Sequence, residues 1–251
     1  MEISLADANI LITGASAGLG RACAIECSRS GARVHLVGRN QAELRKTQDA
    51  LAGQGHSSYI FDLHDFDGYQ GLVDQVVSQH GKLSGFVHAA GIQYMLPFQS
   101  TKVAAYQDSF DINTIAAFEL ARIVVQKKNN LGANLKLVFL ASVMSLVGDI
   151  AISSYCASKT ALVGGARCMA VELASKGIQV NCVSPGSIED TELANLRTLL
   201  SEDDFAAHKA RYPLGLGKTQ DVAALCVYLL SDKANWITGQ NFVIDGGYSA
   251  K

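Results

Sequence analysis

Short apolar runs alternate with helix-patterned stretches from one end of this chain to the other, and this alternation limits the folds it can adopt. Strands separated by helices are typical of a mostly parallel sheet, because each parallel connection needs a crossover. The runs expected to form strands are 9–13, 33–37, 57–61, 85–88, 135–141, 179–183 and 241–244. The stretches expected to form helices are 18–30, 41–53, 65–79, 101–129, 153–176, 191–210 and 219–231. The pattern predicts an α/β fold of one domain over residues 1–251, with helices on both faces of the sheet.

Charge and hydropathy exclude several classes of protein. The formal net charge is −2 and charged residues make up 18% of the chain, which leaves no basic field for nucleic acid. The sequence has no apolar run of about 18 residues, the length that a membrane span needs. Glu2 and Asp7 lie where a signal peptide would be basic. We therefore expect a soluble cytoplasmic protein with no nucleic-acid or membrane partner.

The six cysteines do not predict a metal site. Cys23 and Cys27 share a helix face, as two metal ligands would, but no histidine or second cysteine pair stands near them in the sequence. Small buried core residues are the interpretation that we favour. Cys156 adjoins Tyr155, and that position is the one reason to consider it reactive.

The stretch from Ser142 to Lys159 carries the residues that point to chemistry. It turns helical after Ser153, so Tyr155 and Lys159, four positions apart, project from one helix face. A free tyrosine has a pKa near 10, and a neighbouring lysine cation lowers that pKa by stabilising the phenolate. Ser142, at the end of the preceding strand, would hydrogen-bond a substrate oxygen as it becomes negative. We predict that Tyr155 is the acid/base for a carbonyl; a solvated helix face carrying both residues is the alternative.

A glycine-rich turn follows the first predicted strand. Gly14, Gly18 and Gly20 leave room for the backbone to approach a pyrophosphate, and the helix that follows offers N–H donors and a favourable dipole. The spacing is Gly-x-x-x-Gly-x-Gly rather than the general Gly-x-Gly-x-x-Gly fingerprint. A plain tight connection is the alternative, but the position at the first strand-helix junction favours a dinucleotide site.

The end of the second strand indicates which dinucleotide the site prefers. An NAD enzyme offers a carboxylate to the adenosine ribose here, but this chain has Gly38 followed by Arg39, whose guanidinium suits a 2′-phosphate. The sequence therefore favours NADP(H) and leaves NAD(H) open, with an ordinary solvated arginine as the alternative. Asp62, after the third strand, is placed either to accept a hydrogen bond from the adenine amino group or to cap the next helix.

With these features in place, the chain resembles the short-chain dehydrogenase/reductase family along essentially its whole length. The shared motifs, in family order, are Thr13-Gly14-x-x-x-Gly18-x-Gly20, Asn113, Ser142, Tyr155-x-x-x-Lys159 and Pro185-Gly186. The C-terminal third looks like that of 3-oxoacyl carrier-protein reductases and of sugar or polyol dehydrogenases, through Pro213-Leu214-Gly215, Asp221-Val222-Ala223, Thr238-Gly239-Gln240 and Asp245-Gly246-Gly247. The resemblance implies a Rossmann-type, doubly wound sheet of seven strands that binds a nicotinamide dinucleotide at the strands' carboxyl ends.

The resemblance also implies roles for single residues. Tyr155 would give its proton to a carbonyl oxygen as hydride arrives from NADPH, Lys159 would also bond the nicotinamide ribose, and Ser142 would orient the substrate. Asn113 would hold a water that links Lys159 to a proton relay; an asparagine satisfied by local backbone is the alternative. The residues expected to contact the cofactor are Gly14, Ser16, Gly18, Leu19, Gly20, Arg39, Asp62, Leu63, Ala90, Gly91, Tyr155, Lys159, Pro185, Gly186 and Ile188.

One departure from the family pattern lies after the fourth strand. The family's Asn-Asn-Ala-Gly reads His88-Ala89-Ala90-Gly91 in this chain. The replacement is expected to remove side-chain hydrogen bonds that usually steady that strand. His88 itself is expected to be structural rather than catalytic.

Two more departures concern cofactor contacts. The threonine that usually bonds the carboxamide falls at Asp190, with Thr191 one place late, so either the loop carries a one-residue bulge or the contact is lost. Ala17 replaces the basic residue that many NADP-preferring relatives carry, which leaves Arg39 to act largely alone.

The substrate and the partners are less constrained. Apolar residues in the loops after the fourth and fifth strands suggest a partly apolar pocket for a small ketone, sugar, polyol or 3-oxoacyl thioester: Ile92, Tyr94, Met95, Leu96, Phe98, Val143, Met144 and Leu146. An acyl carrier protein would bind the scattered basic residues Lys127, Lys128, Arg167 and Lys176, although these residues also suit a solvent-exposed face.

On the helices 101–129 and 153–176, apolar residues extend beyond the single face that would pack on the sheet. Together with the family resemblance, these residues imply a homo-oligomer, a dimer or tetramer. A non-catalytic dinucleotide-binding scaffold is the alternative from another class.

Overall fold

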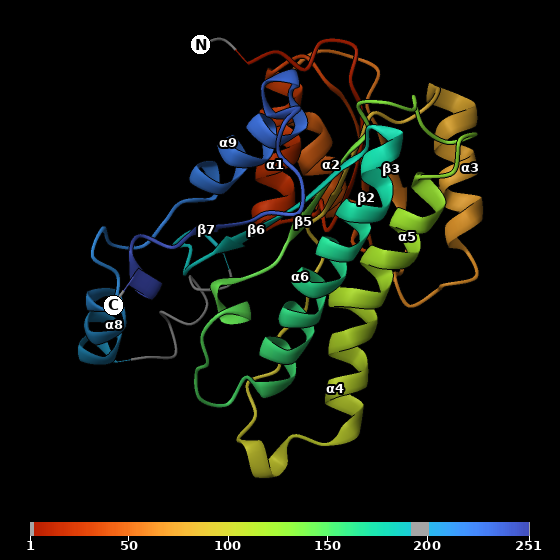
Figure 1. The fold of residues 1–251 in the computed structure, drawn as a ribbon. Coiled ribbons are helices and arrows are strands. Elements are labelled where there is room, and N and C mark those ends of the chain that lie inside the picture. Colours follow the sequence, from red (N-terminus) through yellow and green to blue (C-terminus); the bar gives the residue numbers. More distant parts are fainter. Residues whose placement is uncertain (1–2, 192–200, 251) are drawn as a thin grey trace.

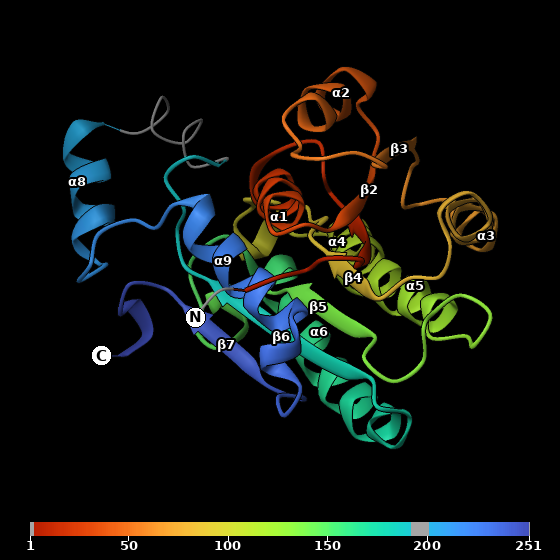
Figure 2. The same ribbon diagram turned by 90° about the horizontal axis from the view of Figure 1, so that it is seen from above.

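The computed structural model describes residues 3–191 and 201–250 of the chain. Seven strands form one sheet in the order β3-β2-β1-β4-β5-β6-β7, and every neighbouring pair is parallel (Figures 1 and 2). The strands are β1 (Asn9–Thr13), β2 (Arg33–Gly38), β3 (Ser57–Ile60), β4 (Gly85–His88), β5 (Lys136–Leu140), β6 (Gln179–Pro185) and β7 (Asn241–Ile244). The predicted doubly wound α/β fold is confirmed, and the strand order reverses between β1 and β4, where such sheets bind ligands.

Helices cover both faces because successive residues of a strand point to opposite sides. Leu11 of β1 packs into a core with α3, α5 and α6, whereas its neighbours Ile10 and Ile12 pack into a second core with α1 and α9. Figure 2 shows these two groups of helices on opposite sides of the sheet. The helices are α1 (Gly18–Arg29), α2 (Gln41–Asp49), α3 (Tyr69–His80), α4 (Val103–Phe110), α5 (Ala116–Val124), α6 (Ser153–Leu173), α8 (Glu202–Ala210) and α9 (Thr219–Leu230). None of these described helices is long and apolar enough to cross a membrane.

The expected helix over 101–129 is shorter and interrupted. A π-helical turn (Asp111–Ile115) separates α4 from α5. Asn130 helps to end α5, because its Nδ2 donates to the carbonyl oxygen of Val124 at 3.0 Å. That bond takes the place of the next turn of helix.

Other helix boundaries also differ from the prediction, and α2 ends at Asp49 rather than at residue 53. α3 begins at Tyr69 rather than at residue 65, because the carboxylate of Asp65 accepts from the backbone N–H of Gly68 at 3.1 Å and holds the chain in a turn. The helix predicted over 191–210 falls in part on residues 192–200, which lie outside the described residues, and α8 forms its last part.

Four of the six cysteines are buried, whereas Cys156 is half-buried and Cys168 is exposed. Cys23 and Cys27 of α1 are fully buried in the same core as Cys226 of α9. Within residues 3–191 and 201–250, no three His, Cys, Asp or Glu side chains gather as metal ligands would. Burial raises the pKa of the Cys156 thiol, which is the opposite of activation.

His88, at the end of β4, makes the hydrogen bonds that its position was expected to lack. Its Nδ1 lies 3.0 Å from the Thr13 hydroxyl of β1, and its Nε2 lies 3.1 Å from the carbonyl oxygen of Ile112 in the π-helical turn. Because a carbonyl only accepts, Nε2 carries the hydrogen and Nδ1 accepts from Thr13. The expectation that the strand loses its side-chain bonds here is therefore wrong, since the imidazole reaches both neighbours.

Burial keeps the His88 ring neutral. Desolvation, aided by the charge of Lys159, lowers the pKa of His88 to about 3. The same ring takes up a proton near pH 6.5 in the unfolded chain, so acid favours unfolding. The stability that depends on neutral His88 is therefore fully present above pH 6.5 and is lost progressively as the pH falls toward 3.

We expect His88→Asn to make folding less sensitive to acid. The variant should be less stable than the wild type at pH 7 by about 1–3 kcal/mol, because buried hydrogen bonds are lost. Between pH 7 and pH 5, however, the wild type should lose about 2 kcal/mol more than the variant, the linkage value for one histidine held neutral by the fold. Urea unfolding at both pH values measures this difference. His56→Gln, which removes a half-buried histidine, is the control; equal losses in the wild type and His88→Asn would contradict the assignment.

Two helix glycines offer a matched test of packing. A Cβ added to Gly165 of α6 would lie 2.2 Å from Cζ of Phe118 in α5, whereas a Cβ on Gly71 of α3 would meet no atom of the described residues within 4 Å. We expect Gly165→Ala to lower the free energy of unfolding by about 1–3 kcal/mol through overpacking. Gly71→Ala should raise it by up to about 1 kcal/mol through helix propensity. Denaturant unfolding of the two variants compares them, and a Gly165→Ala protein as stable as the wild type would refute the close contact.

Candidate active site

The carboxyl ends of four strands bring the predicted site segments to one edge of the sheet. These segments are the glycine turn 14–20 after β1, Ala90-Gly91 after β4, Ser142 after β5 and Pro185-Gly186 at the end of β6. They share an edge because every strand is parallel to its neighbours. The edge includes the point between β1 and β4 where the strand order reverses.

Lys159 is buried and hydrogen-bonded at this edge. α6 begins at Ser153, so Tyr155 lies in its first turn and Lys159 one turn later. Lys159 is only 4% exposed, its Nζ donates to the carbonyl oxygen of Leu140 at 2.7 Å, and Nζ lies 5.8 Å from the centre of the Tyr155 ring. Burial lowers the pKa of Lys159 to about 8, so the cation still prevails at pH 7. A buried positive charge therefore lies beside the tyrosine.

Asn113 lies in the π-helical turn and is fully buried. Its Oδ1 accepts from the N–H of Ile92 at 2.8 Å, and its Nδ2 donates to the carbonyl oxygen of Ile92 at 2.9 Å and to Ser158 Oγ at 2.9 Å. A Cβ on Gly91 would lie 3.3 Å from both Asn113 Oδ1 and Lys159 Nζ, so the two side chains converge there. Asn113 thus holds the loop after β4 against the helix of Tyr155 and Lys159; a water on it stays a prediction.

Ser142 lies between the end of β5 and the short 3₁₀ turn Val143–Ser145. Its Oγ accepts from the backbone N–H of Met144 at 3.2 Å, which caps that turn. The turn packs against α6, the helix that carries Tyr155. Because Oγ is the acceptor in this bond, the hydroxyl can still donate its own hydrogen to a substrate oxygen.

The glycine turn requires glycine where the backbone approaches itself. Gly14 has a φ of 66°, and a Cβ there would lie 2.6 Å from the backbone nitrogen of Ala90. A Cβ on Gly20 would lie 2.2 Å from the carbonyl oxygen of Gly14. At Gly14 the backbone of the turn therefore lies against the segment after β4. At Gly20 the start of α1 lies against the beginning of the turn, and neither place has room for a side chain.

Arg21 anchors this turn, a role that sequence reasoning missed. Its Nη2 donates to the carbonyl oxygen of Ser16 and, at 2.6 Å, to Glu43 of α2. Its Nε donates to Thr47 Oγ1 at 2.9 Å, and Thr47 donates to the carbonyl oxygen of Ala15 at 2.9 Å. These bonds fix the distance between the glycine turn and α2, the places expected for the pyrophosphate and the adenosine. The available signal was an arginine directly after the last glycine of the motif.

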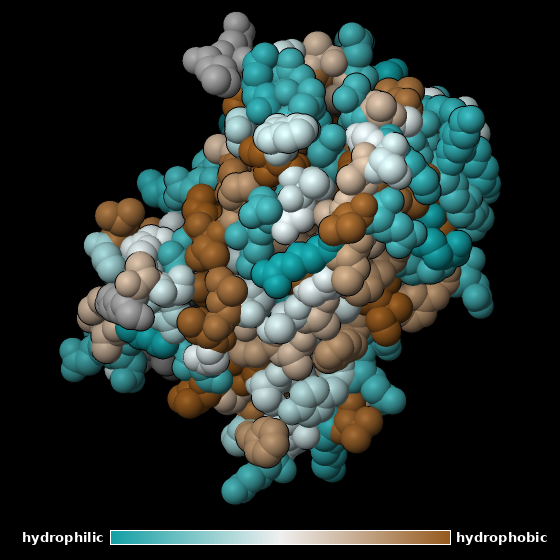
Figure 3. All heavy atoms as spheres, viewed as in Figure 1, coloured by the Kyte–Doolittle hydropathy of each residue, from teal (hydrophilic) through white to brown (hydrophobic). Residues whose placement is uncertain are grey.

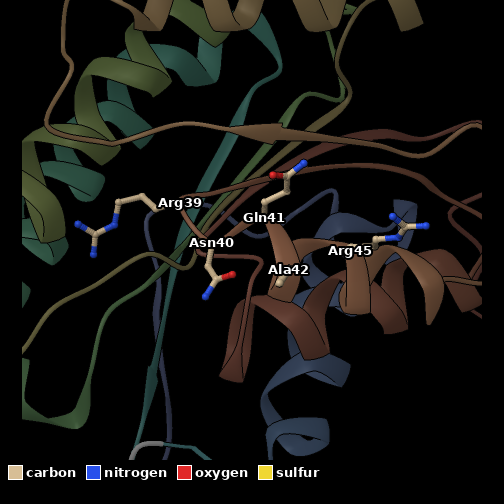
Figure 4. A pocket seen from close by; sticks show the side chains of 5 residues that line it. All are labelled: Arg39, Asn40, Gln41, Ala42 and Arg45. Carbon is tan, nitrogen blue, oxygen red and sulfur yellow. The ribbon is translucent and has the colours of Figure 1, made fainter.

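A surface hollow of about 820 Å³ opens at the start of α2, lined by Arg39, Asn40, Gln41, Ala42 and Arg45 (Figure 4). Arg39 extends toward Asp62, with Nη1 and Oδ2 4.0 Å apart, and Arg45 projects from α2 in the opposite direction. Arg45 is a second cation that sequence reasoning did not single out. Asp62 does not cap α3, because its carboxylate accepts from the backbone N–H of His64 at 3.1 Å.

In the loop after β6, the side chains of the adjacent residues Asp190 and Thr191 bind different partners. The carboxylate of Asp190 accepts from the N–H and the hydroxyl of Thr219 at 2.9 and 2.7 Å, so it anchors the start of α9. Thr191 Oγ1 donates to the carbonyl oxygen of Ile188 at 2.9 Å, and its Cγ2 would lie 3.8 Å from a Cβ on Gly18. Of the two alternatives for this loop, the geometry favours the one-residue bulge, since Thr191 faces the glycine turn.

The loops expected to shape the substrate pocket are mostly at the surface. Met95, Phe98 and Leu146 are 59, 76 and 52% exposed, whereas Val143 is buried and does not line a pocket. A hollow of about 470 Å³ beside the start of α6 is lined by Pro97, Phe98, Asp149, Ile150, Ala151 and Ser153. Its walls are mainly apolar and come from the loops after β4 and β5 and from the start of α6. Of the eight residues expected to line a substrate pocket, Phe98 is the one that lines this hollow.

Comparisons with known proteins agree with this geometry. The family model described as enoyl-(acyl carrier protein) reductase matches residues 14–249. An NADP-dependent (R)-specific alcohol dehydrogenase of Lentilactobacillus kefiri is 28% identical over 245 residues, which cover 96% of each chain. A 3-oxoacyl-[acyl-carrier-protein] reductase of Salmonella typhimurium is 30% identical over 240 residues, which cover 94% of this chain and 95% of that protein.

Solved structures share the architecture. A variant of actinorhodin polyketide ketoreductase, solved with NADPH, has a TM-score of 0.92 at 28% identity, covering 98% of both chains. A dehydrogenase/reductase from Sinorhizobium meliloti 1021 has a TM-score of 0.87 at 29% identity, covering 99% of this chain and 97% of that one. The match of fold, motif order and family model over nearly the whole length leads to one conclusion. The chain is an oxidoreductase that belongs to the short-chain dehydrogenase/reductase family.

Proposed function

We propose that this chain transfers hydride between NADP(H) and a carbonyl or secondary alcohol, with Tyr155 as the acid/base. The observation that carries the proposal is the buried ammonium of Lys159, held by Leu140 and 5.8 Å from the Tyr155 ring. A phenol that must give up a proton gains from such a cation, whereas a binding module has no need of one. The alternatives are an NAD-dependent alcohol or polyol dehydrogenase and a non-catalytic dinucleotide-binding scaffold.

The residues at the sheet edge fit a nicotinamide dinucleotide. The glycine turn leads into the N-terminus of α1, whose N–H groups suit a pyrophosphate. Among the residues that the structure describes, a Cβ on Gly18 would meet only Cγ2 of Thr191, at 3.8 Å, so these residues leave space beside the turn for a ligand. A Cβ on Gly91 would lie 3.3 Å from both Lys159 Nζ and Asn113 Oδ1, and this convergence supports the proposal that the two side chains lie near the nicotinamide ribose. When bound, the nicotinamide supplies or accepts the hydride.

The proton steps follow from this chain's own side chains. In the reductive direction Ser142 donates a hydrogen bond to the substrate oxygen as negative charge develops on it. Tyr155 gives its proton to the same oxygen, and the Lys159 cation stabilises the phenolate that remains. Ser158 helps to hold the helix in place, because its Oγ accepts from Asn113 and donates to the carbonyl oxygen of Tyr155 at 2.8 Å.

Two features of the adenosine end support a preference for NADP(H). A Cβ on Gly38 would lie 3.3 Å from Ser16 Oγ, so the carboxylate side chain of an NAD-type site has little room there. Arg39 and Arg45 make the neighbouring hollow positive, which suits a 2′-phosphate. The alcohol dehydrogenase of Lentilactobacillus kefiri is named NADP-dependent, and the ketoreductase structure contains NADPH.

The substrate class that we propose is a small ketone or secondary alcohol, with sugars, polyols and 3-oxoacyl thioesters included. The mainly apolar hollow beside α6 supports a substrate with an apolar part. An acyl carrier protein remains the less favoured partner, because one of its expected basic contacts, Lys128, already pairs with Asp74 at 2.9 Å.

We also propose that the chain forms a homo-oligomer, a dimer or tetramer. Trp236, Leu214 and Val171 are 99, 87 and 81% exposed, and β7 is an edge strand of the described sheet. Figure 3 shows apolar side chains gathered over β7, whereas the surface over α3 is polar. Several apolar residues of α5 and α6, the helices expected to form an interface, lie in the chain's own core instead: Leu120, Ile123, Val124, Leu162 and Val163.

Removing the Tyr155 hydroxyl tests the catalytic assignment. We expect Tyr155→Phe to lower kcat by about 10²–10⁴-fold, the usual size of general acid/base catalysis, while cofactor affinity stays near that of the wild type. Turnover on a panel of ketones and a separate cofactor titration measure the two effects. Tyr59→Phe is the control. It removes a tyrosine hydroxyl that donates to Gln79 and has no role in the proposed proton steps, so it should keep full turnover. Undiminished turnover in Tyr155→Phe would refute the assignment.

Replacing Arg39 tests the cofactor preference. We expect the wild type to bind NADPH at least about ten times more tightly than NADH, and Arg39→Ala to lose about 1.4 kcal/mol or more of that preference. Parallel titrations followed by fluorescence give both affinities, and Arg45→Ala shows whether the second arginine contributes. Equal or stronger binding of NADH by the wild type would favour the NAD-dependent alternative, and binding of neither dinucleotide would contradict the proposed function and the dinucleotide-binding scaffold alike.

A further inference from the structure

A histidine beside the adenosine end lies between two carboxylates. His64, in the loop after β3, has Nδ1 3.0 Å from Asp62 Oδ1 and Nε2 2.6 Å from Asp108 Oδ1 of α4. An ionised carboxylate only accepts hydrogen bonds, so both ring nitrogens must carry hydrogen for both contacts to form. The geometry is therefore that of an imidazolium.

Each of the two carboxylates also contacts a second side chain through its other oxygen. The second oxygen of Asp108 accepts from the hydroxyl of Tyr94, in the loop after β4, at 2.5 Å. The second oxygen of Asp62 lies 4.0 Å from Nη1 of Arg39. Polar contacts thus run from the loop that flanks the substrate side to the arginine proposed to bind the 2′-phosphate.

Loss of one proton from His64 changes which partner Asp62 takes. A neutral imidazole keeps one N–H, and the shorter contact with Asp108 indicates that Nε2 retains it. Nδ1 then becomes an acceptor and faces the carboxylate of Asp62 without a hydrogen between them. Among the described residues, Arg39 is the other cation beside that carboxylate. Asp62 Oδ1 keeps its bond from the backbone N–H of His64, while Oδ2 draws closer to the guanidinium and competes with a 2′-phosphate for it.

We propose that protonated His64 is a positioning residue for cofactor preference: by holding Asp62, it leaves Arg39 to the 2′-phosphate, and the preference for NADPH falls when His64 loses its proton. This inference rests on the proposed function, because it needs a dinucleotide bound with its 2′-phosphate at Arg39. It goes beyond that function in assigning a pH range to the preference and in naming a residue that controls it.

The charges around His64 place this change in an accessible range. The hydrogen bond to Asp108, followed by that to Asp62, raises the pKa of His64 above 6.5, against a smaller opposing effect of burial. The backbone N–H of His64 lowers the pKa of Asp62, and the Tyr94 hydroxyl lowers the pKa of Asp108; the charge of Arg39 adds a smaller lowering to each. Both acids therefore stay ionised while His64 titrates. A phosphate monoester loses its second proton near pH 6, so the 2′-phosphate is nearly fully charged over most of this range.

The test measures the affinities of NADPH and NADH between pH 6.5 and pH 9 at low salt, by fluorescence titration of the full chain. We expect the ratio of the two affinities to fall about two- to fivefold across this range, the size of one exposed ion pair. In His64→Gln the ratio should be independent of pH. In Asp62→Asn it should also be flat, and as high as that of the wild type at pH 6.5, because the competitor for Arg39 is gone.

Asp108→Asn tests the role of His64 through the midpoint of the pH dependence, which would not shift if His64 were only structural. It leaves His64, Asp62 and Arg39 in place but removes the largest cause of the raised pKa of His64. The midpoint of the pH dependence should therefore shift to lower pH while its amplitude remains. His56→Gln is the matched control and should keep the wild-type profile. His56 directly precedes β3, and its Nδ1 accepts from the N–H of Val34, near the start of β2.

The outcomes separate this inference from the proposed function. Binding with a strong preference for NADPH that does not vary with pH would overturn the role of His64 and leave the proposed function standing. The same pH profile in the wild type and His64→Gln would also overturn it. Binding of neither cofactor, or a preference for NADH at every pH, would overturn both. Thermal unfolding of each variant verifies that the compared proteins are folded.

Discussion

The hydrogen bond from the Lys159 ammonium to the carbonyl oxygen of Leu140 is the interaction on which the rest of the site depends. An unpaired buried charge is costly, and the strand end offers one strong acceptor for it. Because β5 is held between β4 and β6, that acceptor is fixed by the sheet. The position of the cation follows, and so does that of Tyr155 one helical turn earlier. The parallel sheet therefore sets the electrostatics of the proposed proton donor.

The π-helical turn connects this helix to the cofactor side. Ile112 accepts from His88, which also bonds Thr13 at the end of β1, and Asn113 bonds both the loop after β4 and Ser158 of α6. The glycine turn, the fourth strand and the helix of Tyr155 thus belong to one hydrogen-bonded unit. A π-turn places adjacent residues in directions that a regular helix does not combine, which explains an interruption at this point. Changes at His88 are therefore expected to act on the site without touching a ligand.

The sequence-based prediction succeeds where structure depends on near neighbours and fails where it depends on distant ones. The seven strands follow from local apolar runs, and the shared helix face of Tyr155 and Lys159 follows from their spacing. The predicted helix over 101–129 is continuous because its apolar pattern persists through the π-turn. The bonds of His88 to Thr13 and of His64 to Asp108 join residues 75 and 44 positions apart, and no local pattern records them. Family comparison erred at His88 because it identifies which residue is replaced, not what the replacement can reach.

The two ends of the proposed cofactor site differ in burial. As a result, they differ in how strongly solvent screens their charges and in how much a substitution changes stability. Lys159 and His88 lie in the interior, where neighbouring charges and dipoles act with little screening and any substitution also changes stability. The side chains of Arg39 and Asp62 are 65 and 52% exposed, and that of His64 is 41% exposed, so salt and pH modulate their interactions. Surface substitutions of this kind usually cost little stability. Under the proposed function, the fold fixes the proton chemistry firmly while it leaves the choice of dinucleotide to a few exposed charges, which can change without disturbing the core.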